Sequence, residues 1–140
     1  MIVDTHVHVL SEDRKKYPRQ LHPVVPPHFT WTKDDFTAED LLIQMDRCGM
    51  AKALLVQAQN AYKNDNTYIV HMAAKYPDRF KAVVVVDARD AGAADQLEFW
   101  VKEHGAVGGR LMFQTADFLA NDARVNPVMA RAKQLGIPMC

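Results

Sequence analysis

Short apolar runs alternate with helical patterns along the whole of this 140-residue chain. The apolar runs fall at residues 2–9, 53–56, 82–86 and 106–113, and a fifth begins at 137–140. The helical patterns lie between them, at 37–48, 66–76, 93–104 and 126–136. Strands that are joined by crossover helices run parallel, so this order predicts an α/β fold with a parallel sheet.

Local signals support the predicted strands and helices. The run of valines at 83–86 is continuously apolar, as expected for a strand that is covered on both faces. Thr37 with Asp40 three residues later forms a capping-box pattern at the start of the first helix. Asn126 is predicted to cap the last helix, with Pro127 in its first turn. These two capping signals predict where the first and the last helix begin.

The connection over residues 10–36 is unusually long for a βα unit. It contains Pro18, Pro23, Pro26 and Pro27 together with several aromatic residues. A connection of this length inside a compact unit is typically functional or disordered, and its prolines and aromatics favour an ordered lid. The connection begins at the C-terminal end of the first strand, so the lid is expected to lie near the residues at that strand end.

The first strand carries two histidines, His6 and His8, at its C-terminal end. Alternate residues of a strand face the same side, about 7 Å apart at Cα, so both imidazoles can reach one metal ion. The alternative is a strand that merely contains two histidines. A third ligand from His22 or His28 in the long connection is left open, although loop histidines are commonly surface residues.

Polar residues also follow the other predicted strands. Functional groups of parallel α/β folds gather at the C-terminal ends of strands. Gln57 and Gln59 follow the second strand, Asp87 follows the third, and Arg110 lies toward the end of the fourth. Arg110 suits a substrate carboxylate, because guanidinium pairs with carboxylate through two hydrogen bonds, although an ion pair that holds the loop is an equal alternative. Gln57 and Asp87 are further substrate-binding candidates, and Asp87 could equally brace its own loop.

The composition indicates one globular domain over residues 1–140 and argues against several partners. The chain is 49% hydrophobic with a formal net charge of +0, which gives no support for nucleic-acid or membrane-surface binding. No apolar run approaches the roughly 20 residues of a membrane span, and no signal peptide is visible. Cys48 and Cys140 show no paired-cysteine motif. We therefore expect a cytoplasmic protein with reduced thiols.

The segment Ile2–His8 resembles the first strand of the amidohydrolase superfamily, in particular its amidohydrolase 2 branch of metal-dependent TIM-barrel hydrolases. That branch includes lactonases and also decarboxylases of aromatic or muconate-type acids. The resemblance extends to further segments and covers essentially the whole chain; these segments are 46–57, 75–80 and 105–110.

The resemblance implies a (β/α)₈ barrel, of which this chain holds about half: strands one to four and the start of strand five. It implies His6 and His8 as ligands of a divalent metal, with Zn²⁺ the first expectation, although some lactonases of this branch are thought to work without metal. It also implies a histidine at strand five and a general-base aspartate at strand eight. Both lie beyond Cys140, so no catalytic residue is assigned within this chain.

The function that the resemblance implies is hydrolysis of a lactone or related ester-like bond in a small carboxylate-bearing or sugar-derived substrate. Two alternatives remain open. One is decarboxylation by the same kind of site. The other is a truncated, catalytically incomplete half-barrel whose open sheet edges, at strands one and five, pair between copies to form a homo-oligomer, or which flattens into an open, doubly wound sheet.

Overall fold

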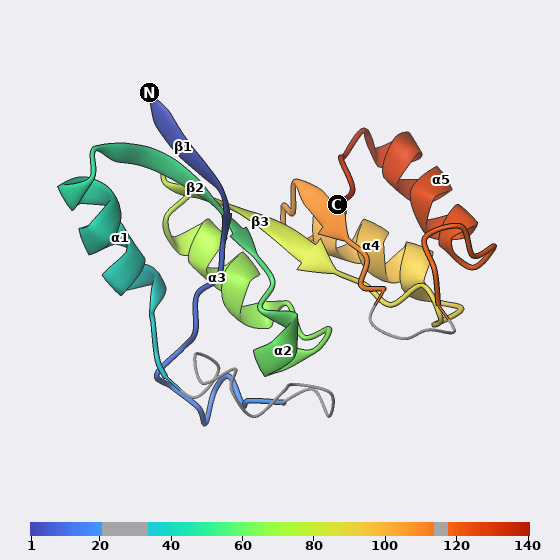
Figure 1. Ribbon diagram of the computed structural model, residues 1–140, viewed down its shortest axis with the longest axis horizontal. Coiled ribbons are helices and arrows are strands. Elements are labelled where there is room, and N and C mark those ends of the chain that lie inside the picture. The colour runs from blue at the N-terminus through green and yellow to red at the C-terminus, as the bar shows by residue number, and fades with distance from the viewer. Residues whose placement is uncertain (21–33, 114–117) are drawn as a thin grey trace.

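The computed structural model describes residues 1–20, 34–113 and 118–140, and its four strands form one parallel sheet (Figure 1). The strands lie side by side in the order of the sequence: β1 (Ile2–Val7), β2 (Met50–Val56), β3 (Phe80–Val85) and β4 (Gly108–Arg110). A parallel bridge between Gly109 and Met139 places the start of a fifth strand beside β4. The parallel sheet that the sequence predicts is therefore confirmed.

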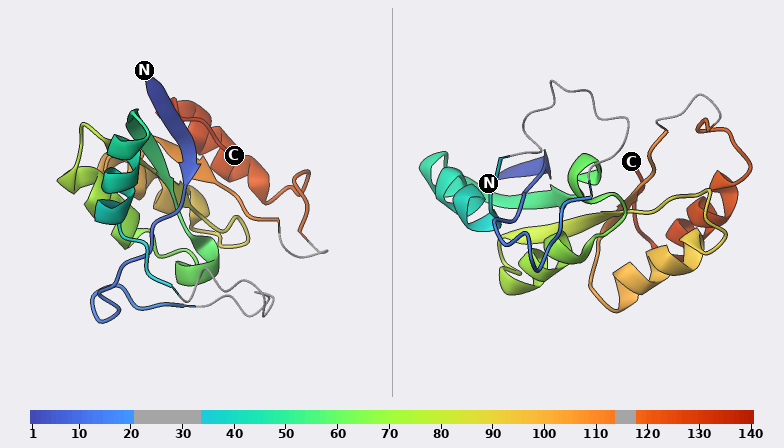
Figure 2. Two further views of the ribbon diagram at one scale, coloured as in Figure 1. Left: turned by 60° about the vertical axis from the view of Figure 1, so that its left-hand side comes forward. Right: turned by 90° about the horizontal axis from the view of Figure 1, so that it is seen from below.

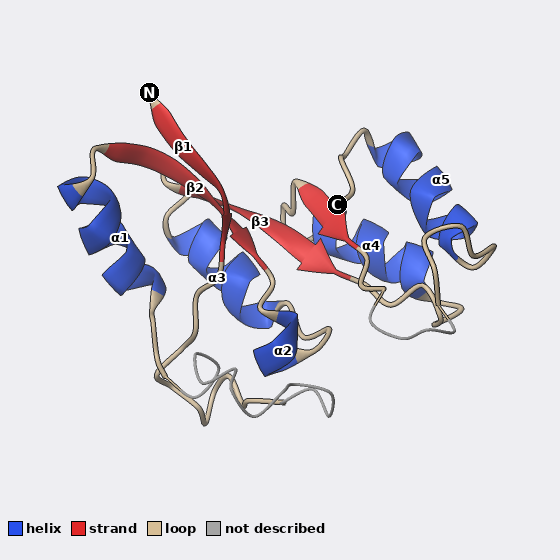
Figure 3. Ribbon diagram, viewed as in Figure 1, coloured by secondary structure: helices blue, strands red, loops and turns tan. Residues whose placement is uncertain are grey.

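Helices follow the strands as expected (Figure 3). They are α1 (Ala38–Arg47), α3 (Thr67–Lys75), α4 (Ala93–Lys102) and α5 (Val125–Leu135). The short helix α2 (Gln59–Tyr62) lies directly after β2 and was not predicted. No helix within the described part of the chain is long and apolar enough to cross a membrane.

The sheet curls as a half-barrel, and its strands follow one another in the order that a barrel has. Each crossover moves one strand further in the same direction, so the helices collect on one face. Figure 2 shows α3 and α4 on the same side of the sheet. A doubly wound sheet would reverse its strand order at a switch point and carry helices on both faces. The barrel interpretation is therefore confirmed over the open-sheet alternative.

The core lies between the outer face of the sheet and the helices. Leu55 and Val84 of the strands are completely buried there, as are Ile69 of α3 and Leu97 of α4. Burial of each such side chain contributes about 1.5–3 kcal/mol. The alternate strand residues, such as Val56 and Val83, face the concave side. All of the valines at 83–86 are buried, as the continuous apolar run predicts.

The helix ends show one confirmed cap and one correction. The Thr37 side chain accepts a hydrogen bond from the backbone N–H of Asp40, whose carboxylate accepts one from the N–H of Thr37. The prediction that Asn126 caps the last helix is wrong, because α5 begins at Val125 and its N-cap is Arg124. Asp122 accepts hydrogen bonds from the backbone and guanidinium of Arg124, which turns the chain into the helix earlier.

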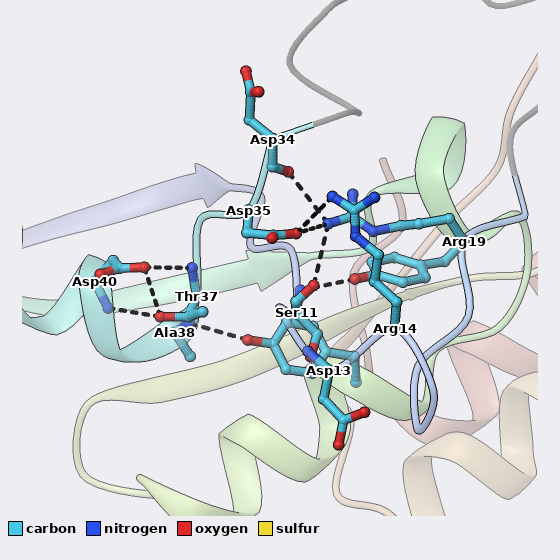
Figure 4. A network of polar contacts seen from close by, with 11 residues as sticks. Ser11, Asp13, Arg14, Arg19, Asp34, Asp35, Thr37, Ala38 and Asp40 are labelled. Atoms are coloured by element: carbon cyan, nitrogen blue, oxygen red, sulfur yellow. Dashed lines mark hydrogen bonds and ion pairs between the residues drawn. The ribbon is translucent and has the colours of Figure 1, made fainter.

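The two described ends of the long connection are fixed to each other and to α2. An antiparallel bridge joins Leu10 to Phe36, and Arg19 donates hydrogen bonds to the Ser11 carbonyl and the Asp35 carboxylate (Figure 4). The backbone N–H of Ser11 donates to the Tyr62 hydroxyl at 2.8 Å. Residues 21–33, including His22 and His28, lie outside the described residues, so the lid over 10–36 stays a prediction.

Candidate metal and substrate site

The structure brings the imidazoles of His6 and His8 together. His6 belongs to β1, and His8 lies one residue beyond its end. The ring centroids are 5.0 Å apart and the ring planes are nearly perpendicular, at 86°. The pairing of β1 with β2 shifts register between Asp4 and Val7, so this strand end is irregular where it presents the histidines.

A backbone carbonyl of β2 fixes the His8 ring. Nδ1 of His8 lies 2.8 Å from the carbonyl oxygen of Val56. Because a carbonyl only accepts, Nδ1 carries the proton and Nε2 keeps its lone pair, which is how metal-binding histidines are commonly oriented. Burial lowers the pKa of His8, opposed by this hydrogen bond and assisted by the nearby charge of Arg110. The neutral form, which binds metals, is therefore favoured.

Arg110 completes this group from the far side of the sheet. It is the last residue of β4, and its Nη1 lies 3.4 Å from Nε2 of His6. A guanidinium only donates hydrogen bonds, so Nε2 of His6 is the acceptor and Nδ1 carries the hydrogen. His6, His8 and Arg110, which the sequence singles out, thus meet at the C-terminal ends of β1 and β4.

Two hollows lie beside these side chains. The larger has a volume of about 210 Å³ on the concave face, and its lining includes His6, Leu54, Val56, Val83 and Met139. The smaller has a volume of about 60 Å³ and is lined by His8, Gln59, Asn60, Arg110 and Met112. His6 and Arg110 are in contact while lining different hollows, so the two spaces adjoin.

Gln57 and Asp87 lie apart from both hollows. Gln57 is completely buried, and its Nε2 donates to the backbone carbonyls of Asp65 and Lys63 between α2 and α3. Asp87 accepts two hydrogen bonds from the Arg89 guanidinium, at 2.8 and 2.6 Å, and this pairing lowers the pKa of the Asp87 carboxyl. These contacts match the loop-bracing alternative for Asp87. A substrate-binding role for either residue stays a prediction.

Gln59 lines the smaller hollow and is absent from the candidate site residues, as are the neighbouring lining residues Asn60 and Met112. It opens α2, a helix of four residues, which is too short to leave a periodic pattern in the sequence. The only available signal is its place directly after the second strand. The two glutamines therefore have different surroundings. Gln57 bonds to the connection between α2 and α3, whereas Gln59 lines the space beside His8 and Arg110.

The arrangement fits two ligands of a metal site. The rings are 5.0 Å apart, and the His8 ring is held by Val56 with its Nε2 lone pair kept. Nε2 of His6 also has a lone pair, which becomes available to a metal ion when the contact with Arg110 opens. Over residues 1–20, 34–113 and 118–140, no three His, Cys, Asp or Glu side chains form a group that could hold a metal ion. His6 and His8 are therefore a partial ligand set, and a complete site needs further ligands.

Residues 3–139 match the family model described as Amidohydrolase, and the chain belongs to this family. The match includes both histidines, Arg110, three whole strands and all of β1 except Ile2. Its known members include hydrolases and decarboxylases. A search of curated proteins finds no match.

Solved structures of enzymes from this family share the fold. A probable 2-pyrone-4,6-dicarboxylic acid hydrolase from Acinetobacter baumannii, with citric acid bound, is 22% identical with a TM-score of 0.73; 99% of this chain covers 48% of that one. A 5-carboxyvanillate decarboxylase from Novosphingobium aromaticivorans, complexed with manganese, is 16% identical with a TM-score of 0.75, at 99% and 49% coverage. A 2,6-dihydroxybenzoate decarboxylase from Rhizobium is 17% identical with a TM-score of 0.71, at 99% and 48% coverage. The chain thus spans about half the length of these structures.

Proposed function

We propose that this chain provides the metal-binding and carboxylate-binding half of a metal-dependent hydrolase. The reaction is the opening of a lactone or related ester-like bond in a small carboxylate-bearing or sugar-derived substrate. The observation that carries the proposal is the convergence of His6, His8 and Arg110 at the C-terminal ends of β1 and β4. Membership of the amidohydrolase family supports the reaction class.

Each residue has a distinct task in this proposal. His6 and His8 hold a divalent ion, with Zn²⁺ the first candidate and Mn²⁺ suggested by the decarboxylase relative. Such an ion lowers the pKa of a bound water molecule toward about 7 and polarises the substrate carbonyl. The Val56 carbonyl keeps the His8 ring in place. Arg110 pairs with the substrate carboxylate and orients the scissile bond, and the general base is an aspartate outside this sequence.

Removal of the two imidazoles tests the proposal. Metal content and hydrolysis of 2-pyrone-4,6-dicarboxylate are measured for the wild type, His6→Ala and His8→Ala. Each variant is expected to bind the metal about tenfold more weakly or worse, because it lacks one of the two imidazole ligands. His71→Gln, which changes a histidine of α3 away from the site, is the matched control. Metal affinity that is unchanged in both alanine variants would contradict the proposal.

Decarboxylation is the second candidate, and the decarboxylases among the structural neighbours favour it. The same ligands and Arg110 would then hold an aromatic acid instead of a lactone. Product analysis separates the two reactions, since carbon dioxide release from 5-carboxyvanillate or 2,6-dihydroxybenzoate indicates decarboxylation. Release of an open-chain acid from a lactone indicates hydrolysis.

We further propose that copies of the chain associate through open sheet edges. Within the described residues, β1 pairs with β2 alone, and Ile2 and Val3 on β1 are 57% and 40% exposed. An unpaired apolar edge favours pairing with another chain. Sedimentation equilibrium is expected to show a dimer, and a clean monomer would contradict this part. The proposal includes a cytoplasmic location, with which the free thiols of Cys48 and Cys140 are consistent.

A further inference from the structure

We propose that Gln59 determines substrate specificity by accepting a hydrogen bond from a hydroxyl group of the substrate. The substrate class is then a small hydroxy acid, whose carboxylate pairs with Arg110 and whose hydroxyl lies against Gln59. This inference rests on the proposed function, since it names the substrate of the same site.

The evidence begins with an unpartnered atom. Gln59 is only 9% exposed, and its Oε1 is shielded from solvent without a hydrogen-bond partner in the described part of the chain. Native proteins pair nearly all buried polar atoms, because an unpaired one loses its hydration without compensation. An amide oxygen only accepts hydrogen bonds. The missing partner is therefore a hydrogen-bond donor.

The position of Gln59 indicates that the donor comes from a ligand. Gln59 lines the same hollow of about 60 Å³ as His8, which follows β1, and Arg110, which ends β4. This hollow is the smaller of the two and has room for a substituent of a ligand. The adjoining hollow of about 210 Å³, lined by His6, has room for the substrate body.

The charge of Arg110 selects among donors. An ammonium group would be repelled by the guanidinium that lines the same hollow, whereas a hydroxyl is neutral and donates one hydrogen bond. Arg110 only donates hydrogen bonds, and a carboxylate is the ligand group that pairs with a guanidinium most strongly. Gln57 also has an unpartnered Oε1, but it lines neither hollow and its amide nitrogen is bonded to the Asp65 carbonyl. The specificity role is therefore assigned to Gln59.

The test compares two acids that differ by one hydroxyl, malate and succinate, on the metal-free protein. Binding is followed by isothermal titration calorimetry. The wild type is expected to bind malate about fivefold more tightly than succinate, the worth of one hydrogen bond to a neutral group. Gln59→Met keeps the side-chain length without the amide and is expected to remove this preference while succinate affinity stays unchanged. Gln134→Met on α5, an exposed glutamine, is the control and keeps the preference.

The outcomes separate this inference from the proposed function. Arg110→Met is expected to weaken both acids equally; if it weakens neither, the carboxylate role of Arg110 fails while the malate preference still reports on Gln59. Equal affinities of the wild type for both acids, or no binding of malate, would overturn the inference. So would a malate preference that persists in Gln59→Met.

Discussion

The Nη1 atom of Arg110 lies 3.4 Å from Nε2 of His6, the nitrogen that the proposed metal site requires as a ligand. One lone pair cannot accept the guanidinium hydrogen and bind a metal ion at the same time. Arg110 is also a permanent positive charge beside a site for a cation. Metal binding and the contact of Arg110 with His6 therefore exclude each other.

Removal of Arg110 is accordingly expected to strengthen metal binding. Arg110→Met should raise the affinity of the chain for Zn²⁺ by about tenfold, because it frees Nε2 of His6 and removes a like charge. Arg110→Lys retains the charge and should give a smaller gain. The measurement is isothermal titration calorimetry with Zn²⁺. Arg47→Met, an exposed arginine at the end of α1, is the control, and an affinity unchanged or weaker in Arg110→Met would contradict the exclusion.

Asn66 is expected to be essential for the stability of the sheet end near the site. It is completely buried, and its amide pairs with both backbone groups of Val85, at 2.8 and 2.9 Å, as a strand neighbour would. Asn66→Ala leaves a buried N–H and carbonyl unpaired and should lower the free energy of unfolding by about 3 kcal/mol in urea titrations. The exposed Asn64→Ala should change it by less than about 0.5 kcal/mol. Similar losses in both variants would argue against this role.

Gly109 and Gly108 should respond differently to alanine. A Cβ on Gly109 would lie 2.5 Å from Sδ of Met139 and 3.0 Å from Cδ1 of Leu97, whereas on Gly108 its nearest neighbours are 3.4 Å away. Gly109→Ala should therefore destabilise the chain by about 1–3 kcal/mol, as overpacking does, and Gly108→Ala by less. Thermal unfolding of both variants compares them. A lower melting temperature for Gly109→Ala than for Gly108→Ala is expected, because the segment that contains Met139 packs closely on β4. Equal melting temperatures would refute this close packing.

Elements with strong periodic signals were predictable from the sequence, whereas short elements were not. The apolar strand runs and the capping box at Thr37 correctly indicated parallel strands and α1. Helix α2 spans one turn, so no repeating pattern marks it. The start of α5 was misplaced, because the Asp122 contacts with Arg124 compete with the capping preference of Asn126. Such competition is decided by three-dimensional contacts that local preferences do not contain.

The candidate site shows the same division. His6, His8 and Arg110 were found because strand ends of a parallel sheet meet at one edge. Gln57 and Gln59 both follow the second strand and are two residues apart, so strand alternation does not distinguish between them. The chain turns toward α2 after Val56, and this turn decides which of the two glutamines lines a hollow. The role of Gln59 follows from the geometry of the turn.

His71 is expected to make the stability of the chain depend on pH. Burial lowers the pKa of His71 from its ordinary value of 6.5, assisted by the charges of Lys16 and His104 and opposed by that of Asp65. Below about pH 6.5 the unfolded chain therefore takes up a proton that the folded chain disfavours, so stability falls as the pH drops through this range. Above this range both states are neutral at His71, and the contribution is constant.

Urea titrations at about pH 7.5 and about pH 5.5 measure this dependence. His71→Gln retains a polar partner for the Tyr17 hydroxyl, which lies 3.0 Å from Nδ1, but cannot titrate, so it should lose less stability on acidification than the wild type. Some dependence should remain in this variant, because burial also lowers the pKa of His8. Tyr17→Phe should keep the wild-type dependence, since burial and not the hydroxyl is the first cause of the shift. An equal loss of stability in His71→Gln and the wild type would show that His71 is not responsible.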